Sequence, residues 1–243
     1  MAALTPVASL PMYDLAGFEA ETDRLWSAIR TELQAEGLDA PSMLDRGLSA
    51  EAAWTHPDLC LSQTCGLPLV TGLAGTATVL GAFDFGLPGC GAGEYNSVLI
   101  ARALPDPDAP MNFAFNERCS QSGYAAPKRY LGARFVAACE TGAHIVSIRA
   151  VADGAAEAAA IDAVTWRLAQ SVEPKAHGLT VFGSTPSTPG LPLITAPDRD
   201  PAPYRRALSR AAAHHAQDSG PLGLRGFVPF DLADYQRAIF PVD

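Results

Sequence analysis

A run of polar residues around Ser120 has the composition of an anion-binding site. Ser120 and Ser122 follow an apolar, strand-like run at residues 111–115 and precede a segment that we expect to be helical. Gly123 lets a backbone approach a ligand closely. Because the first N–H groups of a helix are unpaired and lie at the positive end of its dipole, a helix that begins here would attract an anion. The backbone N–H groups of Gln121 to Tyr124 would carry much of the binding.

Two further polar side chains, His144 and Asp162, follow the next two strand-like runs. In a parallel sheet the carboxyl ends of the strands meet at one edge, so these junctions predict one shared pocket. His144 ordinarily titrates near neutral pH, which would suit an anion that changes its own protonation state. The Asp162 carboxylate would accept a hydrogen bond from a protonated oxyanion or a ligand amine, and it would repel a fully ionised anion.

Each of these residues also has a structural explanation. Serine and aspartate are common helix N-caps, and a single histidine at a junction is often structural. An enzyme would need a nucleophile and a base, and the set worth naming is Cys119 with His144 and Asp162. The sequence has no G-x-S-x-G turn, P-loop or dinucleotide-binding glycine motif that would support catalysis. We therefore expect no enzyme, with a small hydrolase and a ligand-free interaction module as the alternatives.

Strand-like and helix-like segments alternate along the chain, which predicts an α/β fold with mixed, mostly parallel sheets. Two turn-rich segments, residues 104–110 and 184–192, bracket one α/β block. We therefore expect two lobes, with hinges in the turn-rich segments. The first lobe is predicted to hold residues 1–103 with 190–243, and the second to hold residues 104–189.

The composition excludes several classes of partner. The 243 residues carry a formal net charge of −9, which disfavours nucleic acid and anionic membrane surfaces. No apolar run reaches the roughly 20 residues of a membrane span. The five cysteines show no C-x-x-C spacing, so we expect mostly buried thiols and neither metal nor cofactor. The first basic residue is Arg24, so the sequence shows no signal peptide and leaves open a trimmed mature form or a cytoplasmic protein.

The chain resembles the phosphate/phosphite/phosphonate substrate-binding proteins of ABC transporters. The order and spacing of several short pieces carry this resemblance. They are S-L-P-M-Y-D (9–14), L-S-Q-T-C-G (61–66), P-G-C-G-A-G-E-Y-N-S-V (88–98), S-Q-S-G (120–123), T-G-A-H-I-V-S (141–147), A-A-I-D (159–162) and S-T-P-G-L-P-L-I-T (187–195). The resemblance departs at Gln121, where the family often has a hydroxyl residue.

The resemblance implies a two-lobed, type II periplasmic-binding-protein fold with a small oxyanion held between the lobes. It implies a periplasmic or other extracytoplasmic location and a permease of the ABC type as partner. We expect the protein itself to be a monomer. Five residues would contribute from the first lobe: Tyr13, Gln63, Thr64, Tyr95 and Asn96.

Overall fold

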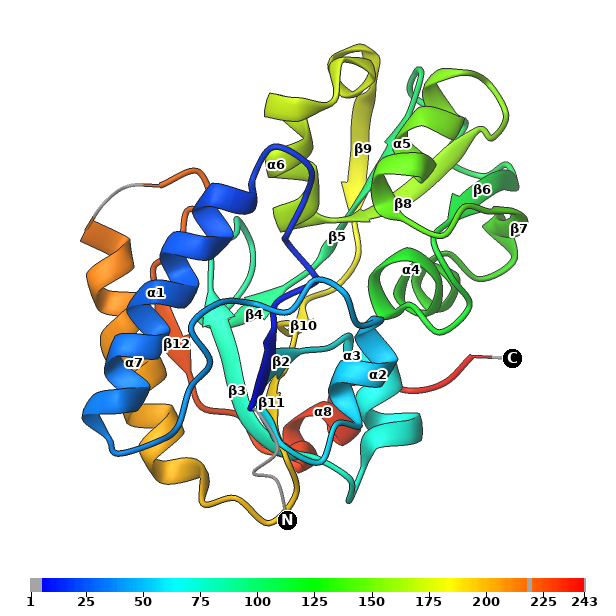
Figure 1. Ribbon diagram of the computed structural model, residues 1–243. Coiled ribbons are helices and arrows are strands. Elements are labelled where there is room, and N and C mark those ends of the chain that lie inside the picture. Colours follow the sequence, from blue (N-terminus) through cyan, green and yellow to red (C-terminus); the bar gives the residue numbers. More distant parts are fainter. Residues whose placement is uncertain (1–5, 218–219, 243) are drawn as a thin grey trace. The chain divides into compact units, whose positions relative to one another are not determined.

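The computed structural model describes residues 6–217 and 220–242, which fall into two compact units. The first unit contains Met1–Glu94 and Pro189–Ala238, and the second contains Tyr95–Thr188 and Ile239–Asp243. Each unit has its own five-stranded sheet with helices packed on it (Figure 1). The two-lobed α/β fold predicted from the sequence is confirmed.

The sheet of the first unit has the strand order β1-β2-β11-β3-β12. Its strands are β1 (Val7–Ser9), β2 (Leu59–Gln63), β3 (Thr78–Asp84), β11 (Leu193–Thr195) and β12 (Gly226–Val228). Its helices are α1 (Glu19–Ala35), α2 (Ala50–Trp54), α3 (Gly66–Pro68), α7 (Pro201–Gln217) and α8 (Leu232–Ala238), with a π-helical turn at Leu69–Leu73.

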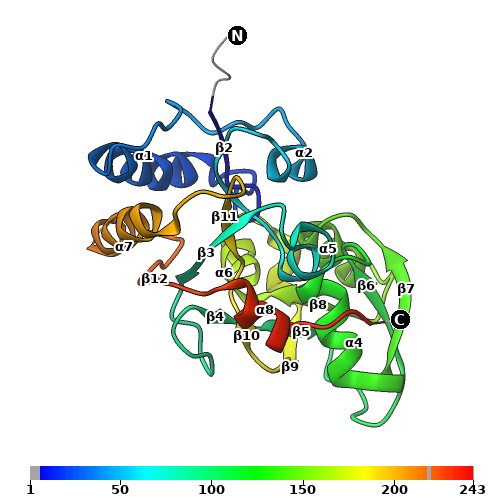
Figure 2. The ribbon, with the colours of Figure 1, turned by 90° about the horizontal axis from the view of Figure 1, so that it is seen from below.

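Helices α1 and α7 lie side by side on one side of this sheet, and α2 and α8 lie on the other (Figures 1 and 2). Helix α1 is amphipathic. It buries Leu25, Trp26, Ile29 and Leu33, which recur at three- and four-residue spacing and therefore share one face.

The sheet of the second unit has the strand order β7-β6-β8-β5-β9. Its strands are β5 (Ser97–Ala101), β6 (Met111–Phe115), β7 (Phe135–Glu140), β8 (Ala158–Asp162) and β9 (Thr180–Ser184). Its helices are α4 (Ala126–Leu131), α5 (His144–Ala152) and α6 (Ala163–Val172), with a π-helical turn at Gln121–Ala125 and 3-10 turns at Gly132–Arg134 and Pro174–Gly178.

Both faces of this second sheet are covered, which explains why its central strands are apolar throughout. Side chains alternate between the faces of a strand. Phe113 and Phe115 of β6 therefore pack with Tyr124 and Leu131, whereas Ala114 between them packs with residues of α5 and α6. The buried core fixes the carboxyl ends of β6, β7 and β8, where the candidate site residues follow.

The sheets are mixed but not mostly parallel. Strand β1 pairs in parallel with β2, and β6 pairs in parallel with β7 and β8. The remaining pairs within the two five-stranded sheets are antiparallel. The sequence pattern shows which strands are followed by helices, but it cannot show how strands from distant parts of the chain pair.

The first crossing between the units lies earlier in the chain than the sequence predicts. It falls between Glu94 and Tyr95, whereas the turn-rich residues 104–110 lie inside the second unit between β5 and β6. The reason is that β5 pairs along its length with β8 and β9. The second boundary, between Thr188 and Pro189, falls within the predicted segment 184–192. Short strands β4 (Glu94–Tyr95) and β10 (Thr188–Pro189) pair where the chain crosses.

Candidate functional site

Ser120 caps the start of the helical segment that follows β6. Its backbone is extended, and its Oγ accepts a hydrogen bond from the backbone N of Gly123 at 3.0 Å. The chain then makes the π-helical turn Gln121–Ala125, all of which is buried, and continues as α4. The expected helix is therefore present, and the structural explanation of Ser120 as an N-cap is correct.

The Ser122 side chain connects the turn after β6 to the turn after β7. Its Oγ lies 2.9 Å from Nε2 of His144, the first residue of α5. Backbone hydrogen bonds hold the two turns together, because Thr141 donates to the carbonyl of Phe115 and Gly142 donates to that of Asn116. The adjacent ends of β6 and β7 thus bring a hydroxyl and an imidazole into direct contact, as the sequence predicts for neighbouring parallel strands.

His144 is neutral at physiological pH in this structure. Burial lowers its pKa to about 4, because a charged imidazolium is poorly solvated there. The expectation that it titrates near neutral pH is therefore wrong for the ligand-free protein. A neutral imidazole can form hydrogen bonds but carries no positive charge.

Asp162 lies at the end of β8 and is the N-cap of α6. It is 2% exposed, and its Oδ1 accepts hydrogen bonds from the backbone N of Val164 at 2.8 Å and of Thr165 at 3.0 Å. The N-cap explanation is therefore correct for this residue too. Capping does not exclude a ligand contact, because a carboxylate has two oxygens and several acceptor positions.

Ser97 connects the end of β8 to the turn after β6. No local sequence pattern gives it a role. It is the register partner of Asp162 in the pairing of β5 with β8. Its Oγ donates to the carbonyl of Ser122 at 2.8 Å, and its backbone N donates to Oγ1 of buried Thr185 at 3.0 Å. Sequence spacing could not find these residues, because their role depends on antiparallel pairing between distant segments.

Gly123 is packed too closely for a side chain. A Cβ added there would meet Oδ1 of Asn116 at 1.9 Å and Cε1 of His144 at 3.3 Å. The space beside the Gly123 backbone, which we expected a ligand to approach, is therefore occupied by side chains of the protein itself. Asn116 opens the polar run in the sequence, but the sequence analysis gave it no role.

Two positively charged side chains contact the Tyr124 hydroxyl. Its hydroxyl accepts from Nη1 of Arg118 at 2.8 Å, and Nζ of Lys128 lies 3.4 Å from the same oxygen. The Arg118 guanidinium also lies over the rings of Phe115 and Tyr124, with centroid distances of 5.6 and 5.4 Å. These cations therefore flank the start of the helical segment without standing among Ser120, Ser122 and His144.

The candidate residues assigned to the first lobe fall into two groups. Tyr13 and Gln63 line one small, mostly apolar cavity of the first unit, and buried Thr64 follows Gln63 directly. Tyr95 begins the second unit, so Tyr95 and Asn96 do not belong to the first. The carbonyl of Asn96 accepts from the backbone N of Ala163, which places it beside the start of α6.

The residues of the hydrolase alternative make other contacts. Cys119 is exposed and its Sγ donates to Oε2 of Glu117 at 3.2 Å, whereas His144 contacts Ser122 and Asp162 caps α6. The five cysteines form no disulfide among the described residues, and Cys60 is the one that is buried. Burial raises the pKa of the Cys60 thiol to about 12. The expectation that the cysteines are mostly buried is therefore wrong.

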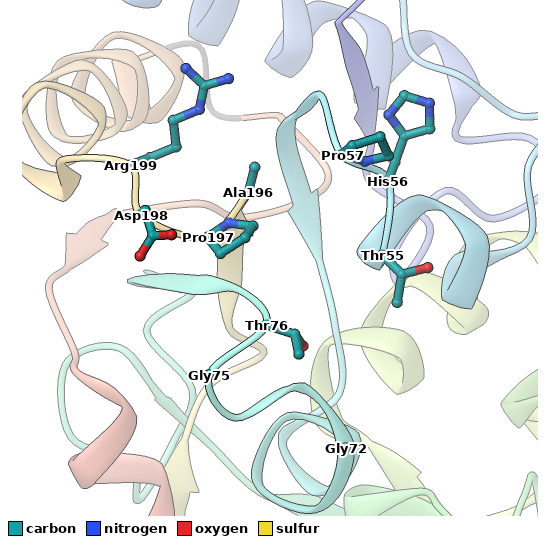
Figure 3. A pocket seen from close by; sticks show the side chains of 10 residues that line it. All are labelled: Thr55, His56, Pro57, Gly72, Gly75, Thr76, Ala196, Pro197, Asp198 and Arg199. Carbon is teal, nitrogen blue, oxygen red and sulfur yellow. The ribbon is translucent and has the colours of Figure 1, made fainter.

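A second hollow, of about 870 Å³, lies in the first unit at the edge of the sheet opposite Gln63 (Figure 3). It is bordered by the segments before β2 and β3 and by the segment after β11. The side chains of His56, Asp198 and Arg199 point in different directions in Figure 3 and do not converge on one point. Its lining residues are Thr55, His56, Pro57, Gly72, Gly75, Thr76, Ala196, Pro197, Asp198 and Arg199. This hollow lacks the converging polar groups that fix a small ligand.

Within residues 6–217 and 220–242, no group of three or more His, Cys, Asp or Glu side chains is placed to hold a metal ion. Among the same residues, no helix combines the length and hydropathy that crossing a membrane requires.

The sequence matches the family model for the periplasmic phosphonate substrate-binding proteins of ABC transporters over residues 91–235. Among solved structures, PhnD1 of Prochlorococcus marinus in complex with methylphosphonate is similar with a TM-score of 0.73 and 17% identity, over 96% of this chain and 94% of that one. A binding protein component of an ABC phosphonate transporter from Pseudomonas aeruginosa has a TM-score of 0.68 and 16% identity, over 96% and 84%. No curated protein sequence matches the chain.

A protein from Xanthomonas citri, solved with chloride and with ATP, is also similar, with TM-scores of 0.66 and 0.64 and identities of 15% and 16%. The chloride-bound structure is matched over 96% of this chain and 97% of that one, and the ATP-bound structure over 96% and 98%. At such identities the likeness establishes the fold, that of the two-lobed type II periplasmic binding proteins. The family match spans more than half of the chain. The chain therefore belongs to the family of periplasmic substrate-binding proteins of phosphonate ABC transporters.

Proposed function

We propose that this protein binds a small oxyanion of the phosphonate, phosphite or phosphate class and holds it without changing it. The observation that carries the proposal is the Ser122–His144 contact at the buried start of the helical segment, in a member of the phosphonate-binding family. The ligand would meet the Ser122 hydroxyl, which the neutral imidazole of His144 holds in place, and backbone N–H groups of the π-helical turn other than that of Gly123, which donates to Ser120. Such preorganised donors favour an anion in a site from which water is excluded.

The charges near this site favour an anion that keeps one proton. His144 is neutral and Asp162 is an acid at the end of β8, so neither offsets a second negative charge on the ligand. A hydrogen phosphonate ion, or a zwitterion with an ammonium group, brings a donor that a carboxylate can accept. Arg118 and Lys128, which sit around Tyr124, would attract the anion as it approaches.

The biological role that we infer is delivery of the bound anion to an ABC-type permease from a location outside the cytoplasmic membrane. Family membership favours binding over catalysis. A hydrolase would show turnover of an ester, amide or phosphate substrate that disappears in Cys119→Ala, and an interaction module would bind a protein but no small anion.

A thermal-shift screen with methylphosphonate, aminoethylphosphonate, phosphite and phosphate tests the proposed ligand class. A ligand that binds the folded state alone stabilises it by about 2.7 kcal/mol at a hundredfold excess over Kd. We expect at least one of these anions to raise the melting temperature at millimolar concentration, and chloride at the same ionic strength to leave it unchanged. Equal effects of chloride and all four oxyanions would contradict a specific site.

We propose further that three residues of the first unit contribute to ligand binding, namely Tyr13, Gln63 and Thr64. Two of the three chain crossings, near Glu94–Tyr95 and Thr188–Pro189, would act as the hinge, in place of residues 104–110. Small-angle scattering should show a smaller radius of gyration with saturating ligand. Ser122→Ala at the same ligand concentration serves as the weakly binding control. An unchanged radius in the fully occupied wild-type protein would count against closure.

A further inference from the structure

Two buried polar atoms at the candidate site have no hydrogen-bond partner among the described residues. They are Oδ1 of Asn116 and Nδ1 of His144. Buried polar groups in native proteins are nearly always paired, so two such atoms at one site call for an explanation. Nε2 of the same imidazole is occupied by Ser122.

Both side chains lie beside Gly123. The position that a Gly123 Cβ would occupy is 1.9 Å from Oδ1 of Asn116 and 3.3 Å from Cε1 of His144, and Cε1 is bonded to Nδ1. The backbone holds them together as well, because the carbonyl of Asn116 accepts at 2.8 Å from Gly142, two residues before His144. The Asn116 amide and the His144 ring are therefore neighbours.

An asparagine amide offers His144 either a donor or an acceptor. Its O and N ends exchange by a rotation of the amide group, and a neutral imidazole carries its single proton on either nitrogen. If the amide donates to Nδ1, the proton of His144 sits on Nε2 and is donated to Ser122 Oγ. If the amide accepts from Nδ1, Nε2 must instead accept the hydroxyl hydrogen of Ser122.

The two arrangements differ in whether the Ser122 hydroxyl group can donate a hydrogen bond to a ligand. In the first, the Ser122 hydroxyl hydrogen is available to an anion. In the second, that hydrogen is used on His144 and lone pairs face the anion, which is unfavourable. An oxyanion therefore selects the first arrangement.

We propose that Asn116 is a positioning residue for the oxyanion site: its side-chain amide donates to Nδ1 of His144, His144 donates through Nε2 to Ser122, and Ser122 directs its hydroxyl hydrogen at the ligand. The pairing of Asn116 with His144 concerns the protein alone. The last step rests on the proposed function. The chain Asn116–His144–Ser122 thus makes a neutral histidine useful at an anion site, and no charge on the imidazole is needed.

Nitrogen-15 NMR of the histidine ring tests the first step directly. In the wild-type protein with saturating methylphosphonate, we expect His144 to carry its proton on Nε2 and to remain in that neutral form from pH 6 to 8. Observation of the Nδ1-protonated form in that complex would overturn the proposal. Because the spectrum of the ligand-free protein is also measured, failure to bind methylphosphonate and failure of the Asn116 pairing are distinguishable.

The variant Asn116→Asp should change the titration of His144. A carboxylate accepts but cannot donate, so it would favour an imidazolium with protons on both nitrogens and raise the pKa of His144 by roughly 1–3 pH units. Methylphosphonate binding should then strengthen as the pH is lowered from 8 to 6, whereas wild-type binding should change little through this residue. Asn116→Leu, which removes the amide at similar size, should leave His144 as a mixture of tautomers and weaken binding at every pH.

Asn112→Asp is the matched control, because Asn112 is exposed on the same strand β6 and the change adds the same charge. Burial is the cause of the low pKa of His144, and both variants leave the charged groups of the neighbouring junctions unchanged. Those groups are Glu117 and Arg118 after β6, Glu140 at the end of β7, Arg149 in α5 and Asp162 before α6. A His144 titration that is the same in Asn116→Asp and Asn112→Asp would overturn the assignment.

Discussion

Replacing Ser122 by alanine is expected to weaken binding of methylphosphonate about 10- to 150-fold. The change removes a hydrogen bond from a buried hydroxyl to an ionised ligand, and such bonds contribute roughly 1.5–3 kcal/mol. It also leaves Nε2 of His144 without its partner at 2.9 Å. Calorimetric titration of the wild type and the variant measures the ratio of the two dissociation constants.

Ser171→Ala is the control for the Ser122 variant. Ser171 is exposed near the end of α6, in the same unit, so the same chemical change there should leave both affinity and stability unaltered. Equal affinities of the wild type and Ser122→Ala, with the variant folded by circular dichroism, would remove Ser122 from the site.

Replacing Asp162 by asparagine is expected to separate ligands with an amine from ligands without one. Asparagine caps helices as well as aspartate does, so the bonds from Val164 and Thr165 can persist while the charge is lost. Aminoethylphosphonate should lose a charge-assisted hydrogen bond of about 1.5–3 kcal/mol, which is roughly 10- to 150-fold in Kd. Methylphosphonate should lose less or bind more tightly, because a repulsive charge has been removed.

Paired titrations of both ligands with the wild type and Asp162→Asn check this selectivity. Losses of the same size for the two ligands would contradict a role of Asp162 in choosing between them. The same charge also sets a pH dependence for phosphate. Because the pKa of His144 is about 4, no imidazolium offsets Asp162 near neutral pH, and affinity should fall as pH rises past the second pKa of phosphate.

The sequence predicts the elements around the site because their patterns are local. The apolar runs of β6 and β8 each show within a dozen residues, and the structure has both strands. Strand pairing is a different matter. The antiparallel register of Ser97 with Asp162 joins residues far apart in the sequence, and it moves β5 into the second unit. No local pattern carries that information, so the predicted boundary at residue 103 was placed too late.

The candidate site also combines features that a local sequence pattern predicts with features that it does not. Ser122 and His144 could be predicted as neighbours because each follows a strand of one parallel pair. Their direct contact depends on the π-helical turn at Gln121–Ala125, which no local sequence pattern predicts. Asn116 went unassigned because an asparagine after a strand is usually a turn residue. The low pKa of His144 was also missed, since burial of a side chain is a property of the packed structure.

The most direct test of the central claim is a backbone amide NMR titration with methylphosphonate. If an oxyanion binds where helical segments follow β6, β7 and β8, the largest chemical-shift changes should appear at the amides of Gln121 to Tyr124, together with the ring of His144. Competition by aminoethylphosphonate should move the same signals. Shifts confined to the hollow of the first unit around Arg199, or no shifts at saturating concentration, would contradict the proposed site.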